Sequence, residues 1–472
     1  MTDPANSTSW DLYDRLAKHR LRWRRKNRHY YRLLEHYLSA IIPRGSTVLE
    51  IGCGIGDLLA ALQPARGVGI DFSPEMIHFA RRRFPQLHFE VQDAHELEVQ
   101  PPLDYILLSD TLGSLQDIQT VLQRVCALCS HRTRVVITNY NYLWQPMLRM
   151  AERLGLKQPE AIQNWLSLHD IAAFLALEEL QVIRQERRIL LPKYIPLLDV
   201  VFNRILANLP LLNRLCLVQI TVARSMRPMA MEREMSVSVV IPARNEKGNI
   251  ENAVRRMPAF GRCQEMIFVE GHSADGTYDE MLRVQTLYPQ HAIRVLQQGG
   301  RGKGNAVREG FAAATGEVLM ILDADLTVLP EDLPKFYRAL QQNRGELING
   351  NRLIYPMETQ AMRTLNLLGN KFFGLLFSWL LGQRLKDTLC GTKVLLREDY
   401  ISIRNQRAFF GDFDPFGDFD LLFGAAHLNL RIVDLPVRYR QRRYGETQIR
   451  RFAHGWLLLR MSIFAARKLK FI

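Results

Sequence analysis

The stretch GEVLMILDAD, residues 316–325, ends an apolar run with two aspartates around one alanine. The run predicts a buried strand, where two neighbouring carboxylates repel each other and resist desolvation. A divalent cation that is also bound to diphosphate oxygens neutralises such a pair. Parallel α/β sheets bind nucleotides at the carboxyl ends of their strands. Asp323 and Asp325 are therefore expected to hold a metal ion on a nucleotide diphosphate.

Apolar runs of the same kind recur on both sides of this stretch and predict two α/β domains. Three runs precede it, SVSVVIPARNE (236–246), EMIFVEGHS (265–273) and AIRVLQQ (292–298). An earlier series comprises STVLEIGCG, GVGIDFS, LDYILLSD, RVVITNY and LCLVQITVARS, between residues 46 and 225. The charged, methionine-rich segment RSMRPMAMEREM lacks any periodic face. We therefore expect one domain over residues 1–223, a linker over 224–235 and a second domain over 236–472, with a helical C-terminal third.

Composition narrows the classes of partner without choosing among them. The chain has 472 residues, a formal charge of +14 and an isoelectric point near 9.6, which suits nucleic acid, anionic lipid headgroups or phosphate-rich substrates. Six scattered cysteines favour a reducing compartment over a disulfide framework. The N-terminus has no signal-peptide pattern.

No run of about 18 apolar residues occurs, so no helix is expected to span a bilayer. The segments at 365–382 and 456–472 are apolar with polar interruptions, which favours helices that lie on a membrane. In the first of them six residues either form an interfacial patch or pack inside a domain: Phe372, Phe373, Leu376, Phe377, Trp379 and Leu380.

A glycine-rich turn follows the first predicted strand, in VLEIGCGIGD at 48–57. Gly52, Gly54 and Gly56 let the backbone approach a ligand closely at the start of a helix. The dinucleotide fingerprint needs a further glycine where the chain has Asp57, so NAD is disfavoured. Two more acids, Asp71 and Asp93, follow the next strands.

This region, about residues 30–223, resembles the class I S-adenosylmethionine-dependent methyltransferases through its E-x-G-x-G-x-G loop and the two later acids. The resemblance implies a Rossmann-like fold. It also implies that Glu50 and Gly52 hold the methionine end of S-adenosylmethionine, Asp71 the ribose and Asp93 the adenine amino group. Asn139 and Tyr140, after a later strand, either orient a methyl acceptor or form a simple turn.

The second half, from about Ser236, contains P-x-x-N-E at 242–246, D-x-D at 323–325 and D-x-x-x-G-x-K at 387–393. In this combination it resembles the family 2 glycosyltransferases of the GT-A fold, in particular the dolichyl- or polyprenyl-phosphate hexosyltransferases. The resemblance implies that Asp323 and Asp325 are catalytic and hold Mg or Mn. The residues implied to bind the nucleotide sugar are Pro242, Asn245, Glu246, Glu270 and Lys303. Those implied to bind the acceptor phosphate are Lys393, Arg442 and Thr447, in KDTLCGTKVL and RRYGETQ.

The second half departs from the family pattern at three places. Glu270–Ser273 stands where the family usually has D-D-G-S, Thr327 where a third metal ligand is often Gln, and Gln448 where Lys is usual. Asp418 and Asp420 are the remaining acids that the resemblance places near the site. They either support catalysis there, together with Arg442, or cap a loop.

Taken together, the two resemblances imply a bifunctional enzyme associated with a membrane surface. Its C-terminal half transfers a hexose from GDP- or UDP-hexose to a polyprenyl phosphate with inversion, and its N-terminal half methylates a sugar or related intermediate. It is expected at the inner, cytoplasmic face of the membrane, without nucleic acid. Three alternatives remain: a glycosyltransferase with a non-lipid acceptor, a basic nucleic-acid methyltransferase, or a non-catalytic binding module.

Overall fold

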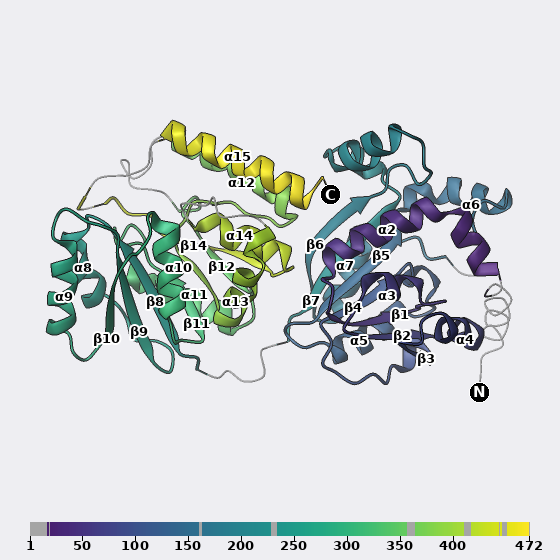
Figure 1. Cartoon of the computed structure of the whole chain (residues 1–472), viewed down its shortest axis with the longest axis horizontal. Coiled ribbons are helices and arrows are strands. Elements are labelled where there is room, and N and C mark those ends of the chain that lie inside the picture. The colour runs from purple at the N-terminus through teal and green to yellow at the C-terminus, as the bar shows by residue number, and fades with distance from the viewer. Residues whose placement is uncertain are drawn as a thin grey trace. The chain divides into compact units, whose positions relative to one another are not determined.

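The computed structural model describes residues 17, 19–159, 163–227, 234–355, 364–409, 417–442, 444–445 and 451–471. The chain forms two compact units, Met1–Arg227 with Phe471–Ile472, and Pro228–Lys470 (Figure 1). Each unit has a seven-stranded sheet of its own. Arg224 and Ser225, expected to open the linker, instead end a strand that pairs with neighbours on both sides.

The sheet of the first unit has the strand order β3-β2-β1-β4-β5-β7-β6; β7 runs antiparallel to both of its neighbours, β5 and β6, and the other neighbouring strands pair in parallel. Its strands are β1 (Thr47–Ile51), β2 (Arg66–Asp71), β3 (His88–Val91), β4 (Tyr105–Ser109), β5 (Arg134–Tyr140), β6 (Leu180–Arg188) and β7 (Val218–Ser225). Its helices are α2 (Arg28–Ile41), α3 (Asp57–Leu62), α4 (Pro74–Arg83), α5 (Ile118–Leu128), α6 (Gln145–Arg153) and α7 (Leu168–Leu177). The five parallel strands have the order of a doubly wound nucleotide-binding sheet.

Helices cover both faces of this sheet, because successive apolar side chains of its central strands point to opposite faces. Val48 and Leu107 face the core beneath α2, α3 and α4, whereas Leu49 and Ile106 face the core beneath α5 and α7. Both faces are therefore buried, which explains why the strands appear in the sequence as continuous apolar runs. Because β1 pairs with β2 and β4 in parallel, the carboxyl ends of these three strands lie at one edge of the sheet.

The sheet of the second unit has the strand order β10-β9-β8-β11-β13-β12-β14. Its strands are β8 (Val237–Ala243), β9 (Gln264–Glu270), β10 (Ala292–Gln297), β11 (Val318–Ile321), β12 (Leu347–Asn351), β13 (Lys393–Leu396) and β14 (Ile432–Pro436). Its helices are α8 (Lys247–Arg255), α9 (Thr277–Leu287), α10 (Lys303–Ala313), α11 (Leu333–Gln341), α12 (Thr364–Leu381), α13 (Arg397–Asn405), α14 (Asp418–His427) and α15 (Arg451–Leu469).

Strand β13 runs antiparallel to both of its neighbours, β11 and β12. Because of this reversal, the start of β13 lies beside the end of β11, where the two aspartates follow. The apolar runs predicted as strands are strands in both units. The C-terminal third, expected to be helical, also contains β12, β13 and β14.

The two long C-terminal helices, α12 and α15, are partly buried. Helix α12 buries Phe377 and Leu380 in a core that also receives side chains of α10, α13 and α14, while Phe372 and Leu375 are exposed. Phe377 and Leu380 therefore belong to the interior and not to a surface patch. Among the described residues, no helix has the length and apolarity needed to cross a bilayer.

Candidate active sites

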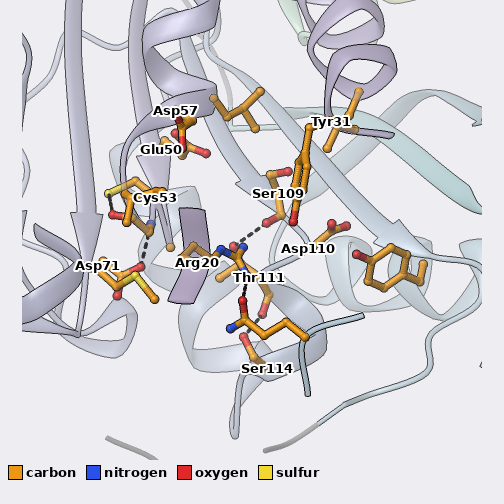
Figure 2. Close-up of a pocket in the computed structure, with 18 of the residues that line it drawn as sticks. Arg20, Tyr31, Glu50, Cys53, Asp57, Asp71, Ser109, Asp110, Thr111 and Ser114 are labelled. Carbon is orange, nitrogen blue, oxygen red and sulfur yellow. Dashed lines mark hydrogen bonds between the residues drawn. The ribbon is translucent and has the colours of Figure 1, made fainter. Parts of the chain in front are cut away.

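A cavity of about 670 Å³ lies in the first unit at the carboxyl ends of β1, β2 and β4 (Figure 2). Its lining includes Glu50, Asp71 and Asp93, the three acids singled out in the sequence, and Gly52 and Gly54. Gly56 is not part of the lining. It begins α3 with φ of 78°, and a Cβ there would lie 2.7 Å from the ring of Phe89.

Glu50 is a buried carboxyl on the wall of this cavity. It is 2% exposed, and its Oε2 has no hydrogen-bond partner among the described residues. Burial raises the pKa of Glu50 to about 8, although nearby Arg24 opposes the rise. A ligand that carries a positive charge to this oxygen would remove the cost of ionising it.

Asp71 joins the glycine loop to the following helix. Its two carboxylate oxygens accept hydrogen bonds from the backbone N–H groups of Gly54, at 2.8 Å, and Ser73, at 3.0 Å. A Cβ on Gly54 would meet nothing within 4 Å, so the loop leaves open space there. Asp93 starts a short 3-10 turn, and its Oδ1 accepts from His95 N at 2.9 Å.

A fourth acid in the cavity, Asp110, was not assigned a role from the sequence. It follows β4 with φ of 57°, and its carboxylate accepts hydrogen bonds from Tyr30 Oη and Thr138 Oγ1, each at 3.1 Å. Burial raises the pKa of Asp110, against the effect of the two hydrogen bonds and of Lys157. The sequence did contain a sign of this role, because Asp110 ends the apolar run LDYILLSD.

The two residues after β5 that were candidates for orienting an acceptor have different environments. Tyr140 lines the cavity. Asn139 is buried, and its amide donates to the carbonyls of Tyr140 and Leu166 and to Gln219 Oε1. Asn139 therefore fixes the local fold, whereas Tyr140 faces the space where a ligand would bind.

The two aspartates of the second unit follow β11, and each is paired with a cation. Lys303 Nζ lies 2.6 Å from Asp323 Oδ1, and Arg442 donates to Asp325 Oδ2 at 2.7 Å. Burial alone would raise the pKa of Asp323, but Lys303 holds it below its usual value. Thr327 donates both its N–H and its hydroxyl to Asp325 Oδ1. Thr327 thus orients Asp325.

The predicted nucleotide-sugar residues surround the end of β8. Arg442 lies 3.1 Å from Glu246 Oε1, so one guanidinium joins Glu246 to Asp325. Burial raises the pKa of Glu246 to about 7, with Arg442 opposing. Two neighbouring loops are connected through Asn245 Oδ1, which accepts from Ala274 N at 2.9 Å. Glu270 accepts from Ser273 N at 2.5 Å, and Pro242 is paired with Val269 in the sheet.

Lys393 differs from the expectation that it contacts an acceptor phosphate. It begins β13, a central strand, and is fully buried, with Nζ 2.8 Å from Asp418 Oδ1 and 2.6 Å from the carbonyl of Cys390. Lys393 therefore holds the carboxylate of Asp418 in place. Asp420 faces elsewhere, toward Arg308 and Arg407 at 3.4 and 3.2 Å. Thr447 and Gln448 lie outside the described residues.

Gly391 leaves room for the pair formed by Lys303 and Asp323. A Cβ at Gly391 would lie 2.1 Å from Asp323 Oδ2 and 2.3 Å from Lys303 Nζ. In the described part of the chain, no group of three or more acidic, histidine or cysteine side chains forms a metal centre. Two carboxylates still fit Mg or Mn, because these ions take their other ligands from substrate phosphates and water.

The folds and the two sites define an α/β protein of the transferase class. Residues 22–185 match the family model for a methyltransferase domain, and residues 238–409 match the model for glycosyl transferase family 2. The chain thus carries a methyltransferase domain followed by a family 2 glycosyltransferase domain. These matches confirm the resemblances stated from the sequence, with a Rossmann-like fold first and a GT-A fold second.

Curated relatives match a part of the chain. A dolichol-phosphate mannosyltransferase of Pyrococcus furiosus is 34% identical over 122 residues, which are 25% of this chain and 34% of the relative. An undecaprenyl-phosphate 4-deoxy-4-formamido-L-arabinose transferase of Salmonella dublin is 28% identical over 138 residues, 28% of this chain and 42% of the relative. The chain thus spans well under half the length of these relatives.

Two solved structures each resemble about half of the chain. A possible histamine N-methyltransferase of Thermotoga maritima covers 46% of this chain and 99% of its own, with 12% identity and a TM-score of 0.37. Glucosyl-3-phosphoglycerate synthase of Mycobacterium tuberculosis, in complex with Mn²⁺ and uridine diphosphate, covers 50% of this chain and 80% of its own, with 19% identity and a TM-score of 0.37.

Proposed function

We propose that the second unit transfers a hexose from a nucleotide sugar to a polyprenyl phosphate at a membrane surface. The observation that carries this proposal is the pair of aspartates after β11 in a domain of glycosyltransferase family 2. Each aspartate forms an ion pair with a lysine or arginine side chain. The names of the curated relatives supply the acceptor class.

Acidic and basic residues of this site would have different roles. Asp323 and Asp325 would hold Mg or Mn, which when bound neutralises the diphosphate leaving group. Glu246, Asn245 and Glu270 would bind the nucleotide. Arg442, released from Asp325, offers a planar fork of donors to an acceptor phosphate. An anionic phosphate needs no strong general base, so positioning supplies much of the rate.

Sugar transfer tests this proposal directly. The full chain is incubated with Mn or Mg, a panel of GDP- and UDP-hexoses and a polyprenyl phosphate, and products are read by mass spectrometry. We expect one lipid-phosphate hexose, lost in Asp325→Asn and retained in Asp332→Asn. Asp332 is a matched control because it pairs only locally, with Lys335 at 2.7 Å. Absence of product with every donor would contradict a lipid-phosphate acceptor.

We also propose that the first unit transfers a methyl group from S-adenosylmethionine to a hydroxyl of a sugar or related intermediate. The cavity supports this proposal, because Glu50, Asp71, Asp93 and Asp110 all line it. Glu50 would bind the amino group, Asp71 the ribose and Asp93 the adenine. Asp110 would accept the proton that the acceptor hydroxyl loses when its oxygen takes the methyl group and the sulfonium becomes a thioether.

Two measurements on Asp110→Asn separate binding from chemistry. Calorimetry with S-adenosylhomocysteine should give wild-type affinity, because Asp110 takes no part in holding the cofactor. Methyl transfer to the product of the sugar-transfer assay should fall by roughly 10²- to 10⁴-fold, the usual contribution of a positioned base. Asp104→Asn is the control, since Asp104 caps Thr47 outside the cavity. Wild-type transfer by Asp110→Asn would rule out this role.

A further inference from the structure

The connection between β6 and β7, residues 189–217, exposes many large apolar side chains. Leu197 is 85% exposed and Leu211 75%, although soluble proteins bury most such residues. The connection is nonetheless anchored at its centre. Asn203 is buried, accepts hydrogen bonds from the N–H groups of Leu190 and Leu191, and receives one from Tyr37 Oη at its carbonyl. Its exposed side chains are therefore held on an ordered scaffold.

Helix α6 and the turn after it extend the same surface. Trp144 Nε1 donates to the carbonyl of Leu215 at 2.8 Å, and Asn141 donates to that of Arg214 at 2.9 Å, so α6 starts beside the connection. We call nine of the exposed apolar side chains of both segments the apolar rim: Met147, Met150, Leu154, Leu156, Tyr194, Leu197, Val200, Leu211 and Leu215. Many exposed apolar side chains on two adjoining segments indicate an interaction site.

The charges around the apolar rim are mainly positive. Residues 189–217 contain three cations, Lys193, Arg204 and Arg214, all exposed, and one acid, Asp199. That acid is already paired, at 2.7 Å from His29 Nε2. Apolar residues interspersed with exposed cations are the pattern of a surface that lies on anionic lipid.

The apolar rim borders the cavity of the first unit. Met147 and Leu156 belong to the rim and line the cavity, as does Lys193 beside the rim. Lys193 Nζ donates to Asn27 Oδ1 at 2.8 Å, and Asn27 donates to the carbonyl of Leu156 at 3.2 Å, so α6 and the β6–β7 connection meet at the N-terminal segment. A molecule that lies on the rim is therefore next to the cavity.

We propose that the apolar rim binds an anionic lipid bilayer, and that the methyl acceptor is an amphiphile reaching the cavity from that bilayer. The second part rests on the proposed methyl transfer, whereas the first does not. A second copy of the chain fits less well. A two-fold interface would bring the cations Lys193, Arg204 and Arg214 of both copies onto one surface, where Asp199 and Glu152 are already paired with His29 and Lys157.

Vesicle partition of the full chain tests the lipid contact. Sedimentation is measured with vesicles of phosphatidylcholine alone and of phosphatidylcholine mixed with phosphatidylglycerol. We expect stronger binding to the anionic vesicles, reduced at least about tenfold in the double variant Leu197→Glu/Leu211→Glu, because two apolar contacts are lost. Leu177→Glu is the matched control, since Leu177 is 64% exposed on α7, outside the rim. Unchanged S-adenosylhomocysteine binding checks the fold.

Wild-type partition by the double variant would overturn the proposal, because the contact with lipid would then lie elsewhere in the chain. A dimer in sedimentation velocity that the double variant dissociates would also overturn it, in favour of self-association. Methyl transfer is then compared between a glycosylated polyprenyl phosphate in vesicles and its water-soluble head group. Equal rates would overturn delivery from the bilayer. No transfer to either, with intact vesicle binding, would contradict the proposed methyl transfer and leave the lipid surface standing.

Discussion

Arg442 donates to Asp325 at 2.7 Å, and the same guanidinium lies 3.1 Å from Glu246. Burial alone would lower the pKa of Arg442, but Asp325 and Glu246 raise it. Asp325, the predicted metal ligand, is therefore already paired with a cationic side chain, Arg442. If Asp325 held a divalent ion, that ion would compete with this guanidinium for the carboxylate, and Arg442 would then be available to another anion.

Replacing Arg442 with alanine should strengthen metal binding while weakening sugar transfer. Loss of one charge-assisted contact on Asp325 predicts a gain of about tenfold in Mn²⁺ affinity, measured by calorimetry without substrate. Transfer should fall because the acceptor phosphate loses its donor. Arg338→Ala is the control, since Arg338 is exposed on α11 and its side chain donates, among the described residues, only to the carbonyl of Pro334. Weaker Mn²⁺ binding by Arg442→Ala would show that the arginine does not compete for Asp325.

Gly391→Ala should impair sugar transfer through displacement of Lys303 and Asp323. The new Cβ would meet both side chains at less than contact distance, and a shift of about 1 Å in a catalytic group costs on the order of 10²-fold in rate. Gly369→Ala in α12 offers a control, because its Cβ would meet nothing within 4 Å. Equal rates for the two variants would mean that the pair formed by Lys303 and Asp323 tolerates displacement.

The pair of Lys393 and Asp418 should show strong coupling in stability. Lys393 is fully buried, so Lys393→Met leaves a buried carboxylate without its partner, at a cost of about 3–5 kcal/mol. The double variant Lys393→Met/Asp418→Asn should recover most of that loss. Calorimetric unfolding of the two single variants and the double variant measures the coupling. Additive losses would indicate that Lys393 acts through packing alone.

Binding of S-adenosylmethionine should release about one proton at around pH 6.5. In the free protein the pKa of Glu50 is near 8, so the carboxyl is protonated there, whereas a bound ammonium favours the carboxylate. Affinity should therefore rise as pH increases toward 8. Because the pKa of Glu50 is raised in the folded protein, the folded state holds this proton more tightly than the unfolded state. The contribution to the free energy of unfolding is fully present below the unfolded pKa and is lost as pH rises through about 8.

Calorimetry in two buffers of different ionisation enthalpy counts the released proton. The control Glu50→Gln has the same shape without a titratable group, and its binding should release no proton. A release of equal size in this variant would assign the proton to another group.

The sequence predicts strands well where the sheet buries both faces. The run containing Val135, Val136 and Ile137 is continuous because alternate side chains enter different cores. Strand β12 was missed because it reads LINGN, where asparagine and glycine are typical of turns. Strand β6, LQVIRQERR, was missed because its charged residues lack a clear two-residue period.

The candidate sites could be predicted where an acid lies at the carboxyl end of a parallel strand or directly after it. Glu50, Asp71 and Asp93 line one cavity for this reason. The contact of Asp110 with Tyr30 is not predictable from local sequence, because the two are 80 residues apart and meet only when α2 covers the sheet. The burial of Lys393 depends on β13 lying between β11 and β12, which the sequence does not indicate.

Each hydrophobic core assigned among the described residues belongs to one unit only. Damage to one interior therefore need not unfold the other. Because both units belong to one polypeptide, synthesis supplies the two candidate sites in a fixed one-to-one ratio. Dosage of the gene changes both together, whereas heat or a destabilising mutation can leave a chain with a single working half.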